Sequence, residues 1–363
     1  MRKLFSYMRN IRNFVVYWIA ALLLPKKNIV LFSSSKNDQF GNISSLEFYF
    51  QNENIKFKRI FKEQLKSDPF YFLFILAQAR VLVIDASSPA ARFGLHHKTC
   101  LIHCWHAGGA YKKIAFDAKR KNYKDENEEN RIKRIHRCIS YFVCSSVETA
   151  HIYAKAFRLA SHQMLTFGLP RLDVPMKEPI PEPPFNYTIL FAPTYRTQEK
   201  NSRHLPPMPD AVSLRSVLEK QLGESVRLVF RGHPTAPVLA DLTGWENWSD
   251  MPQSEALKRA SVLITDYSSI IFDFLPFNRP IVFYVPDIDE YQYYERELYF
   301  SPYDVFPQTT CADLHNLIRI LAECRYMKVD YDEFWKKHMS ACDGKSTQRL
   351  CAFIQEIMRG ERV

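Results

Sequence analysis

Short apolar runs alternate with helical stretches along most of the chain, and the alternation restarts after a proline-rich segment. Before that segment the runs lie at 29–34, 81–86, 100–105, 139–144 and 165–167, and after it at 188–192, 226–230, 262–265 and 281–285. Runs of this length are too short for helices and are typical of buried parallel strands. The alternation predicts an α/β fold with two doubly wound parallel-sheet domains that face each other across a cleft.

Helical stretches are expected between these runs. They lie at 44–52, 69–79, 128–137 and 147–157 in the first half, and near 212–222, 253–260, 270–277, 312–323 and 346–359 in the second. The proline-rich segment, 174–184, has five prolines in eleven residues and is typical of an extended connector. We therefore expect an N-terminal α/β domain at 29–178, a C-terminal α/β domain at 179–340 and a C-terminal helix at 341–363.

The segment 1–28 stands apart from both domains. Basic residues flank an uncharged run at 14–24, which is shorter than the roughly 20 residues needed to span a bilayer. No small-residue cleavage site follows the run, as it would in a secretory signal. The pattern favours a basic amphipathic helix that lies in the membrane interface, and a helix docked on the protein's own core is the alternative. The membrane contacts expected from this pattern are Arg9, Arg12, Trp18, Lys26 and Lys27.

The charge balance indicates acidic partners. The formal net charge is +10, and no recognised nucleic-acid motif accompanies it, so anionic lipid or a phosphate-rich substrate is favoured over nucleic acid. Glycine is scarce, at 10 residues, and neither GxGxxG nor GxxxxGK[ST] occurs. A dinucleotide-binding Rossmann site and a P-loop are therefore disfavoured.

The cysteines favour a reduced, cytoplasmic protein, because the eight of them contain no C-x-x-C spacing. Cys100, His103, Cys104 and His106 crowd together like metal ligands. They lie in a predicted strand, however, where side chains alternate between the two faces and cannot converge on one ion. We expect no metal site.

Four predicted strands end in short polar clusters, at 106–113, 193–196, 231–234 and 265–269. Ligands of open α/β sheets bind beyond the carboxyl ends of the strands, so we expect these clusters to form one site. The last cluster precedes a predicted helix, whose free N–H groups and positive dipole end bind phosphate. Ser268 and Ser269 would cap this helix and donate to phosphate oxygens, and a capped turn without a ligand is the alternative.

The side chains near these strand ends suit phosphate chemistry. Arg171, Arg196 and Arg231 carry planar guanidinium groups that bind phosphate oxygens in pairs. His106 and His233 titrate near neutral pH, so one suits a general base and the other an acid or a phosphate contact. Two carboxylates would orient a histidine or hold ribose hydroxyls: Asp266 and Asp273.

Six segments carry a more specific signal. They read WH…KKIAFD at 105–117, GLPRLD at 168–173, APTYR at 192–196, RGHP at 231–234, TDYSSIIFD at 265–273 and DGKSTQR at 343–349. In the same order they resemble the WHG…KK.GFD, G.PR.D, APT.R, R.HP, TDYSS..FD and DG..S.R motifs of the CDP-glycerol glycerophosphotransferase family, which includes the teichoic-acid primases and polymerases. The resemblance runs from about residue 29 to the end of the chain.

This resemblance implies a GT-B architecture. The C-terminal domain would bind CDP-glycerol, and the N-terminal domain would bind a membrane-linked glycan, teichoic-acid-type or capsule acceptor at the cytoplasmic side of the cell membrane. Glycerol phosphate would pass to an acceptor hydroxyl with release of CMP, and no metal or other cofactor would be required.

The resemblance also implies roles for individual residues. His106 would be the base, and His233 would stabilise the diphosphate as its charge shifts. The implied donor-binding residues are Ala107, Gly108, Arg171, Pro193, Thr194, Arg196, Arg231, Gly232, Asp266, Ser268, Ser269 and Asp273.

One departure and several alternatives qualify these expectations. The residues after His106, at 107–110, read AGGA where polymerases commonly have Gly-Thr-Pro, which is more similar to a primase-type variant. The donor could instead be CDP-ribitol, and a GT-B glycosyltransferase with another nucleotide-activated donor would show the same pattern. A non-catalytic basic protein that docks on anionic membrane or nucleic acid is the alternative from another class. Which of the two histidines is the base is also open.

Overall fold

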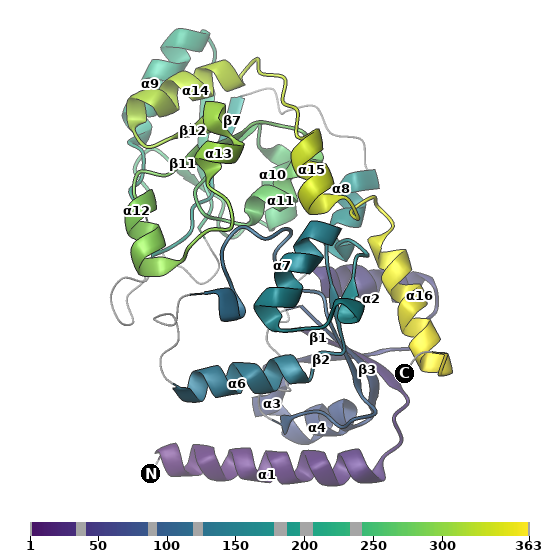
Figure 1. Cartoon of the computed structure of the whole chain (residues 1–363). Coiled ribbons are helices and arrows are strands. Elements are labelled where there is room, and N and C mark those ends of the chain that lie inside the picture. Colours follow the sequence, from purple (N-terminus) through teal and green to yellow (C-terminus); the bar gives the residue numbers. More distant parts are fainter. Residues whose placement is uncertain are drawn as a thin grey trace. The chain divides into compact units, whose positions relative to one another are not determined.

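The computed structural model describes residues 2–33, 41–85, 93–118, 126–177, 187–196, 206–232 and 242–361. The chain divides into two compact units, each built on a parallel sheet (Figure 1). The first unit comprises Met1–His106, Tyr123–Lys177 and Lys337–Val363, and the second comprises Ala107–Asn122 and Glu178–Lys336. Each unit is therefore assembled from separate stretches of sequence.

The described part of the first unit contains a six-stranded sheet with the order β2-β1-β3-β4-β5-β6, in which every neighbouring pair is parallel. Its strands β1, β3 and β4 are almost wholly buried, as expected for a parallel sheet covered on both faces. The strands are β1 (Asn28–Ser33), β2 (Lys58–Phe61), β3 (Ala79–Ile84), β4 (Cys100–His103), β5 (Tyr141–Val143) and β6 (Met164–Leu165).

The helices α2 and α16 pack against each other and against this sheet (Figure 1). Leu46 of α2 and Leu350 and Ile354 of α16 are fully buried with the central strands. The helices of the unit are α1 (Arg2–Leu23), α2 (Asn42–Asn52), α3 (Gln64–Ser67), α4 (Pro69–Ala77), α6 (Glu126–Arg137), α7 (Val147–Phe157), α8 (Asp173–Lys177) and α16 (Ser346–Arg359).

The described part of the second unit also contains a six-stranded parallel sheet, with the order β12-β11-β10-β7-β8-β9. Its strands are β7 (Tyr187–Phe191), β8 (Val226–Phe230), β9 (Glu246–Asn247), β10 (Val262–Thr265), β11 (Ile281–Tyr284) and β12 (Thr310–Cys311). Its helices are α9 (Ala211–Leu222), α10 (Gln253–Arg259), α11 (Ile270–Phe274), α12 (Ile288–Glu290), α13 (Pro302–Val305) and α14 (Leu314–Cys324). Leu214 and Leu317 join α9 and α14 to one core with the strands.

The two parallel sheets confirm the predicted fold class. The structure adds elements that were not predicted: β2, the two-residue strands β9 and β12, and α15 (Asp332–Met339). Strand β2 is only half buried and β9 is exposed, so neither carries the continuous apolar run of a central strand. The predicted helix at 270–277 is shorter than expected, because α11 ends at Phe274 and a 3₁₀ turn, Leu275–Phe277, follows.

Two stretches do not stay with their sequence neighbours. Residues 107–122 follow β4 of the first unit but belong to the second, and the last 27 residues, Lys337–Val363, return to the first. Sequence reasoning expected the segment at 341–363 as a separate helix, whereas α16 forms part of the core of the first unit. A change of unit after Lys177 falls in the proline-rich region.

Helix α1 has one face against the first unit and one face exposed. Asn13, Tyr17 and Ala21, spaced by one helical turn, are buried against the unit, where α1 packs along α4 (Figure 1). The exposed side of the helix carries Arg9, Asn10 and Arg12 and, mostly, large apolar side chains: Tyr7, Met8, Ile11, Phe14, Val15, Ile19, Leu22 and Leu23. Of the helices that the structure describes, none combines the length and the apolarity that a membrane crossing would need.

Candidate active site

Strand β4 leads to His106 through a strained residue. Trp105 has a φ of 52°, a left-handed conformation that is costly for a residue with a Cβ. Its indole ring packs edge-on against Phe157, with ring centroids 5.1 Å apart. The turn leaves His106 exposed, with its imidazole against the Trp105 ring at 4.2 Å. An exposed imidazole on a fixed turn is suited to take a proton from a substrate hydroxyl.

The side chain of Asn42, at the start of α2, holds this turn. Its Nδ2 donates to the backbone carbonyl of Trp105 at 2.7 Å, and its Oδ1 accepts from the backbone N–H of Arg171 at 3.2 Å. Asn42 is 1% exposed, so one buried amide joins the turn that carries His106 to the segment that carries Arg171. Sequence reasoning missed Asn42, because an asparagine at a helix start is common and nothing nearby marks it.

The segment 168–173 is packed against the C-terminal part of the first unit. Gly168 has a φ of +79°, and a Cβ there would lie 2.3 Å from the carbonyl oxygen of Ala341. The Asp173 carboxylate accepts hydrogen bonds from the first two backbone N–H groups of α16, at 3.0 and 2.7 Å. The motif-like segments at 168–173 and 343–349 are therefore structural partners, and their packing positions Arg171.

Ala107 and Gly108 belong to the second unit, where Gly108 meets α11. A Cβ at Gly108 would lie 2.2 Å from the Cβ of Phe272, so only glycine fits at this position. Helix α11 directly follows Ser268 and Ser269. The predicted donor-binding residues Ala107 and Gly108 thus lie in the unit that holds the two serines, and covalent linkage places His106 directly before them.

The turn after β10 presents its serine side chains differently from the prediction. Ser268 Oγ accepts from the backbone N–H of Ile270 at 3.3 Å, whereas Ser269, at the N-cap position, makes no capping bond with its side chain. Both serines are partly exposed. Tyr111 steadies the turn by donating from its hydroxyl to the backbone carbonyl of Asp266 at 3.1 Å. The Ser269 hydroxyl is therefore not used for capping.

Arg196 and Asp266 form a buried ion-pair network instead of an open phosphate clamp. Arg196 Nη1 donates to Asp266 Oδ2 at 3.0 Å, while its Nε and Nη2 donate to the two carboxylate oxygens of Asp287 at 2.7 and 3.0 Å. Arg196 is 3% exposed and Asp266 is 1% exposed. Its three guanidinium nitrogens thus all donate to protein groups, and the predicted contact of Arg196 with the donor stays a prediction.

Two tyrosines that stack on each other lie beside the same guanidinium. The rings of Tyr267 and Tyr291 are stacked with centroids 3.8 Å apart, and Arg196 lies 5.0 and 4.8 Å from them. Burial acts to lower the pKa of Arg196, but the charges of Asp266 and Asp287 outweigh it and hold that pKa above its ordinary value. The network is therefore permanently charged, and it fixes the turn between β10 and α11.

The predicted contacts Pro193 and Thr194 follow β7. Asp266 Oδ1 accepts from the backbone N–H of Thr194 at 2.8 Å, which ties the segment to the turn after β10. Pro193 is buried beside it. The Thr194 hydroxyl is buried and has no hydrogen-bond partner in the part of the chain that the structure describes. A buried hydroxyl in this setting is suited to a polar ligand atom.

Arg231 and Gly232 follow β8 and hold the segment 248–251. Arg231 Nη1 donates to the backbone carbonyls of Trp248 at 2.9 Å and of Met251, and the Gly232 N–H donates to Ser249 Oγ at 3.0 Å. Burial lowers the pKa of Arg231 from its ordinary value. At least one nitrogen of the Arg231 guanidinium is therefore bonded to backbone carbonyls at the end of β8 and not to a ligand.

The remaining predicted residues complete the inventory. Asp273 Oδ2 accepts from Gln253 Nε2 at 3.0 Å, which joins α10 to α11. His233 lies outside the described residues. Lys112 lies in the first of the six motif-like segments, and the sequence predicts no role for it. Burial lowers its pKa to about 8. Its charge therefore changes near neutral pH, which makes it a candidate that the sequence pattern contained but did not single out. No metal-like group of three or more His, Cys, Asp or Glu side chains occurs in the described ranges.

Comparison with known proteins decides the family. The sequence pattern of the CDP-glycerol:poly(glycerophosphate) glycerophosphotransferases matches residues 15–356, nearly the whole chain. The chain belongs to this family. It is accordingly an enzyme of the glycerophosphotransferase type.

Individual relatives agree with this assignment. The teichoic acid glycerol-phosphate primase of Bacillus subtilis (strain 168) is 29% identical over 273 residues, which cover 72% of this chain and 69% of that protein. The teichoic acid ribitol-phosphate primase of Bacillus spizizenii is 25% identical, with 94% of each chain covered. A structure of the wall teichoic acid polymerase TagF covers 99% of this chain and 98% of its own, with a TM-score of 0.79 and 21% identity. It confirms the GT-B-type fold.

Proposed function

We propose that this glycerophosphotransferase acts as a primase-type enzyme on a membrane-linked acceptor at the cytoplasmic face of the cell membrane. In the reaction, an acceptor hydroxyl oxygen attacks the β-phosphorus of CDP-glycerol. The bond from that phosphorus to the bridging oxygen breaks, and CMP leaves with the bridging oxygen. The acceptor proton passes to His106.

One observation carries the site assignment: His106 directly precedes the residue at which the chain enters the second unit. Gly108, two residues later, packs on α11 beside the serine turn. His106 is thus separated by one residue in the sequence from a glycine that packs on the helix following the predicted phosphate-binding turn. Exposure of His106 and fixation of its turn by Asn42 support the role of base.

The donor is proposed to bind the second unit. The Ser269 hydroxyl, which makes no capping bond, and the buried Thr194 hydroxyl would donate to phosphate or nucleotide oxygens. Arg196 and Asp266 would act through the turn that they fix. The first unit would contribute Arg171 besides His106. In this proposal the protein's own groups neutralise the diphosphate, so turnover is expected to persist after treatment with EDTA.

Glycerol is the favoured donor polyol and ribitol the second candidate. The family description names CDP-glycerol, and one solved TagF structure was soaked with CDPG, which supports glycerol. The B. spizizenii relative that matches 94% of this chain is a ribitol-phosphate primase, which keeps ribitol under test. The AGGA sequence after His106 supports single addition rather than polymerisation.

Membrane attachment is proposed to run through α1. Its exposed apolar face includes Leu22 and Leu23, which are 71% and 77% exposed, and Arg9 and Arg12 are exposed on the same helix. The Trp18 indole N–H donates to the carbonyl of Phe93 at 2.9 Å, and its predicted membrane contact stays a prediction.

The deciding experiment measures CMP release from CDP-glycerol and from CDP-ribitol with a detergent-solubilised lipid-linked acceptor. His106→Ala is expected to reduce turnover about 10²–10⁴-fold while donor binding persists, because only proton removal is lost. His162→Ala removes another exposed histidine of the first unit and is expected to leave turnover unchanged. Full activity of His106→Ala, or no CMP release from either donor, would contradict the proposal.

A further inference from the structure

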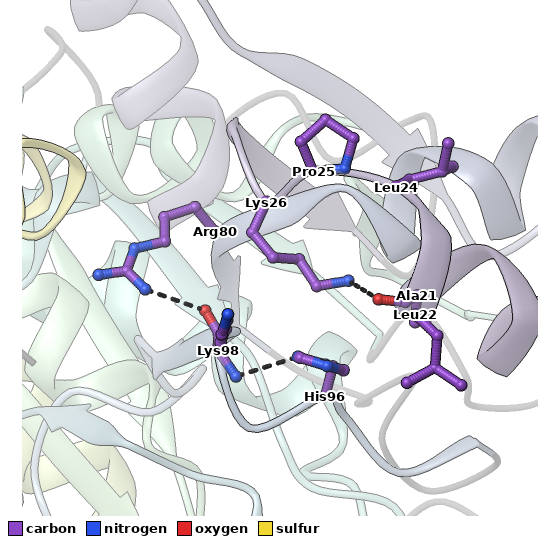
Figure 2. A pocket seen from close by; sticks show the side chains of 8 residues that line it. All are labelled: Ala21, Leu22, Leu24, Pro25, Lys26, Arg80, His96 and Lys98. Carbon is purple, nitrogen blue, oxygen red and sulfur yellow. Dashed lines mark hydrogen bonds between the residues drawn. The ribbon is translucent and has the colours of Figure 1, made fainter.

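A basic pocket of about 340 Å³ lies at the end of α1 (Figure 2). It is formed where α1, the connector to β1, the start of β3 and the loop before β4 meet. Its cationic lining consists of Lys26, Arg80 and Lys98, and His96 lies beside them. The volume lies at the lower end of the range of small-ligand sites, which is about 300–1,000 Å³.

Two of the three cations of the pocket, Lys26 and Arg80, are held in place by backbone carbonyls. Lys26 Nζ donates to the carbonyl of Ala21 at 2.9 Å, in the last turn of α1, and to the carbonyl of Ala77, at the end of α4. Arg80 Nη1 donates to the carbonyl of Lys98 at 3.4 Å. Lys26 therefore caps two helix ends, while Arg80 is oriented along the pocket wall (Figure 2).

No carboxylate offsets these charges in the described part of the chain. The pocket lining contains no Asp or Glu, and none of its cations forms an ion pair with a described residue. Burial and the charge of Lys98 lower the pKa of Lys26, and burial together with Lys26, His97 and Lys98 lowers the pKa of His96. The groups thus repel one another, and a bound anion would relieve that repulsion.

His96 adds a neutral hydrogen-bond donor. Its Nδ1 accepts from the backbone N–H of Lys98 at 3.2 Å, which leaves the proton of the neutral ring on Nε2. His96 is 8% exposed, so the ring is fixed. Two cationic side chains, one capped ammonium and one ring N–H together match an anion with several acceptor oxygens, as phosphate has.

The other side of the pocket is apolar and continues along α1. Leu22, which is 71% exposed, lines the pocket with Leu24 and Pro25. Leu22 also belongs to the exposed face of α1, together with Ile11, Val15 and Ile19. An amphiphile could place its phosphate among the cations and its hydrocarbon along this face.

We propose that this pocket binds the headgroup phosphate of an anionic phospholipid. The inference rests on the proposed attachment of α1 to the membrane and specifies its lipid partner. Phosphate itself is the shared chemistry, and a lipid headgroup is favoured over free phosphate because the cations adjoin the apolar face of α1. The pocket would orient the enzyme on the bilayer, apart from the chemistry at His106.

The test compares two kinds of vesicle of equal surface charge in a co-sedimentation assay. One contains phosphatidylcholine with phosphatidylglycerol, and the other contains phosphatidylcholine with oleate, which is anionic but carries no phosphate. The full chain is expected to bind the phosphatidylglycerol vesicles at least several-fold more tightly. The variant Arg80→Gln/Lys98→Gln is expected to lose that preference and bind both kinds alike.

Lys27→Gln is the matched control, because Lys27 is an exposed neighbour of Lys26 that does not line the pocket. It should weaken binding to both vesicles equally and keep the preference. A preference that survives Arg80→Gln/Lys98→Gln, or is absent from the unaltered protein, overturns the proposal. If inorganic phosphate abolishes the preference for phosphatidylglycerol vesicles and chloride of equal ionic strength does not, the pocket is a site for free anions. That result would overturn the assignment to lipid.

Two further readouts separate this inference from other failures. Thermal unfolding of Arg80→Gln/Lys98→Gln should match the unaltered protein, because Lys26, which caps the helix ends, is kept. CMP release with a detergent-solubilised acceptor should also be unchanged. If CMP release fails in every variant while the lipid preference behaves as described, the proposed reaction is wrong and the lipid site stands.

Discussion

At the scale of single residues, buried carboxylates decide which arginines at the strand ends are already engaged by the protein itself. The polar clusters at the strand ends were visible because apolar runs stop there. What the pattern could not show is which cations are already consumed by buried carboxylates. Arg196 has the composition and position of a phosphate ligand, yet Asp287, 91 residues further along the chain, engages its guanidinium.

Replacing Arg196 should therefore damage stability before it damages donor affinity. Arg196→Met leaves the buried Asp266 and the partly buried Asp287 without their ion-pair partner and is expected to cost about 3–5 kcal/mol in the free energy of unfolding. Arg196→Lys keeps the charge but loses the paired hydrogen bonds, so the expected loss is smaller. Urea unfolding measures both. An unchanged midpoint of urea unfolding together with a raised KM for CDP-glycerol would instead support a direct contact between Arg196 and the donor.

At the scale of elements, helix α16 and the segment 168–173 pack against each other, and each determines where the other lies. Sequence reasoning predicted α16 with the bounds that the structure shows, but it gave no sign of where the helix packs. The apolar stripe of α16 shows that one face is buried, but it does not show which other elements cover that face. The capping by Asp173 and the close approach at Gly168 are among the contacts that specify the partner.

Gly168→Ala should be strongly destabilising, for two separable reasons. The left-handed conformation alone costs about 1–2 kcal/mol, and the Cβ would also collide with the backbone of Ala341. Gly360→Ala is the matched control, because Gly360 has a φ of +80° at the end of α16 and open space around it. The free energy of unfolding of the first unit should fall more in Gly168→Ala than in Gly360→Ala. Equal decreases would contradict the steric argument.

One face of α1 is docked on the first unit, as one alternative from the sequence expected, and its other face is exposed, so that membrane contact stays a prediction. Ile11→Gln/Ile19→Gln should weaken vesicle binding without altering stability, because both side chains are about half exposed, at 47% and 53%. The expected loss is about 1 kcal/mol for each, or roughly 30-fold together. Val212→Gln, an exposed valine of α9, should have no effect, and vesicle co-sedimentation compares the two.

At the scale of the whole molecule, the two-sheet fold followed from the alternation of strands and helices. The assignment of every stretch to its unit did not, because apolar periodicity reports that a face is buried and not against what. Residues 107–122 look like a loop of the first half, but contacts with Phe272 and Asp266 place their described part in the second.

The two units should respond differently to acid. Burial lowers the pKa of His136 and of His338, both in the first unit, to about 4. The unfolded chain binds protons near pH 6.5, so the stability of the first unit is expected to fall between about pH 6.5 and 4, by at most about 3 kcal/mol per histidine. Hydrogen exchange of each unit across this range would show it. His136→Gln should make the stability of the first unit depend less on pH. An equal loss of stability in both units would contradict the prediction.

The passage of the chain between the units has a consequence for biosynthesis. The polypeptide changes unit after His106, Asn122, Lys177 and Lys336, so the first unit receives α16 only after the whole of the second unit has been translated. Until those residues leave the ribosome, the face of the first sheet that Leu350 and Ile354 cover stays open. A nascent or prematurely terminated chain must therefore expose that surface to chaperones and proteases, however completely its second unit has folded.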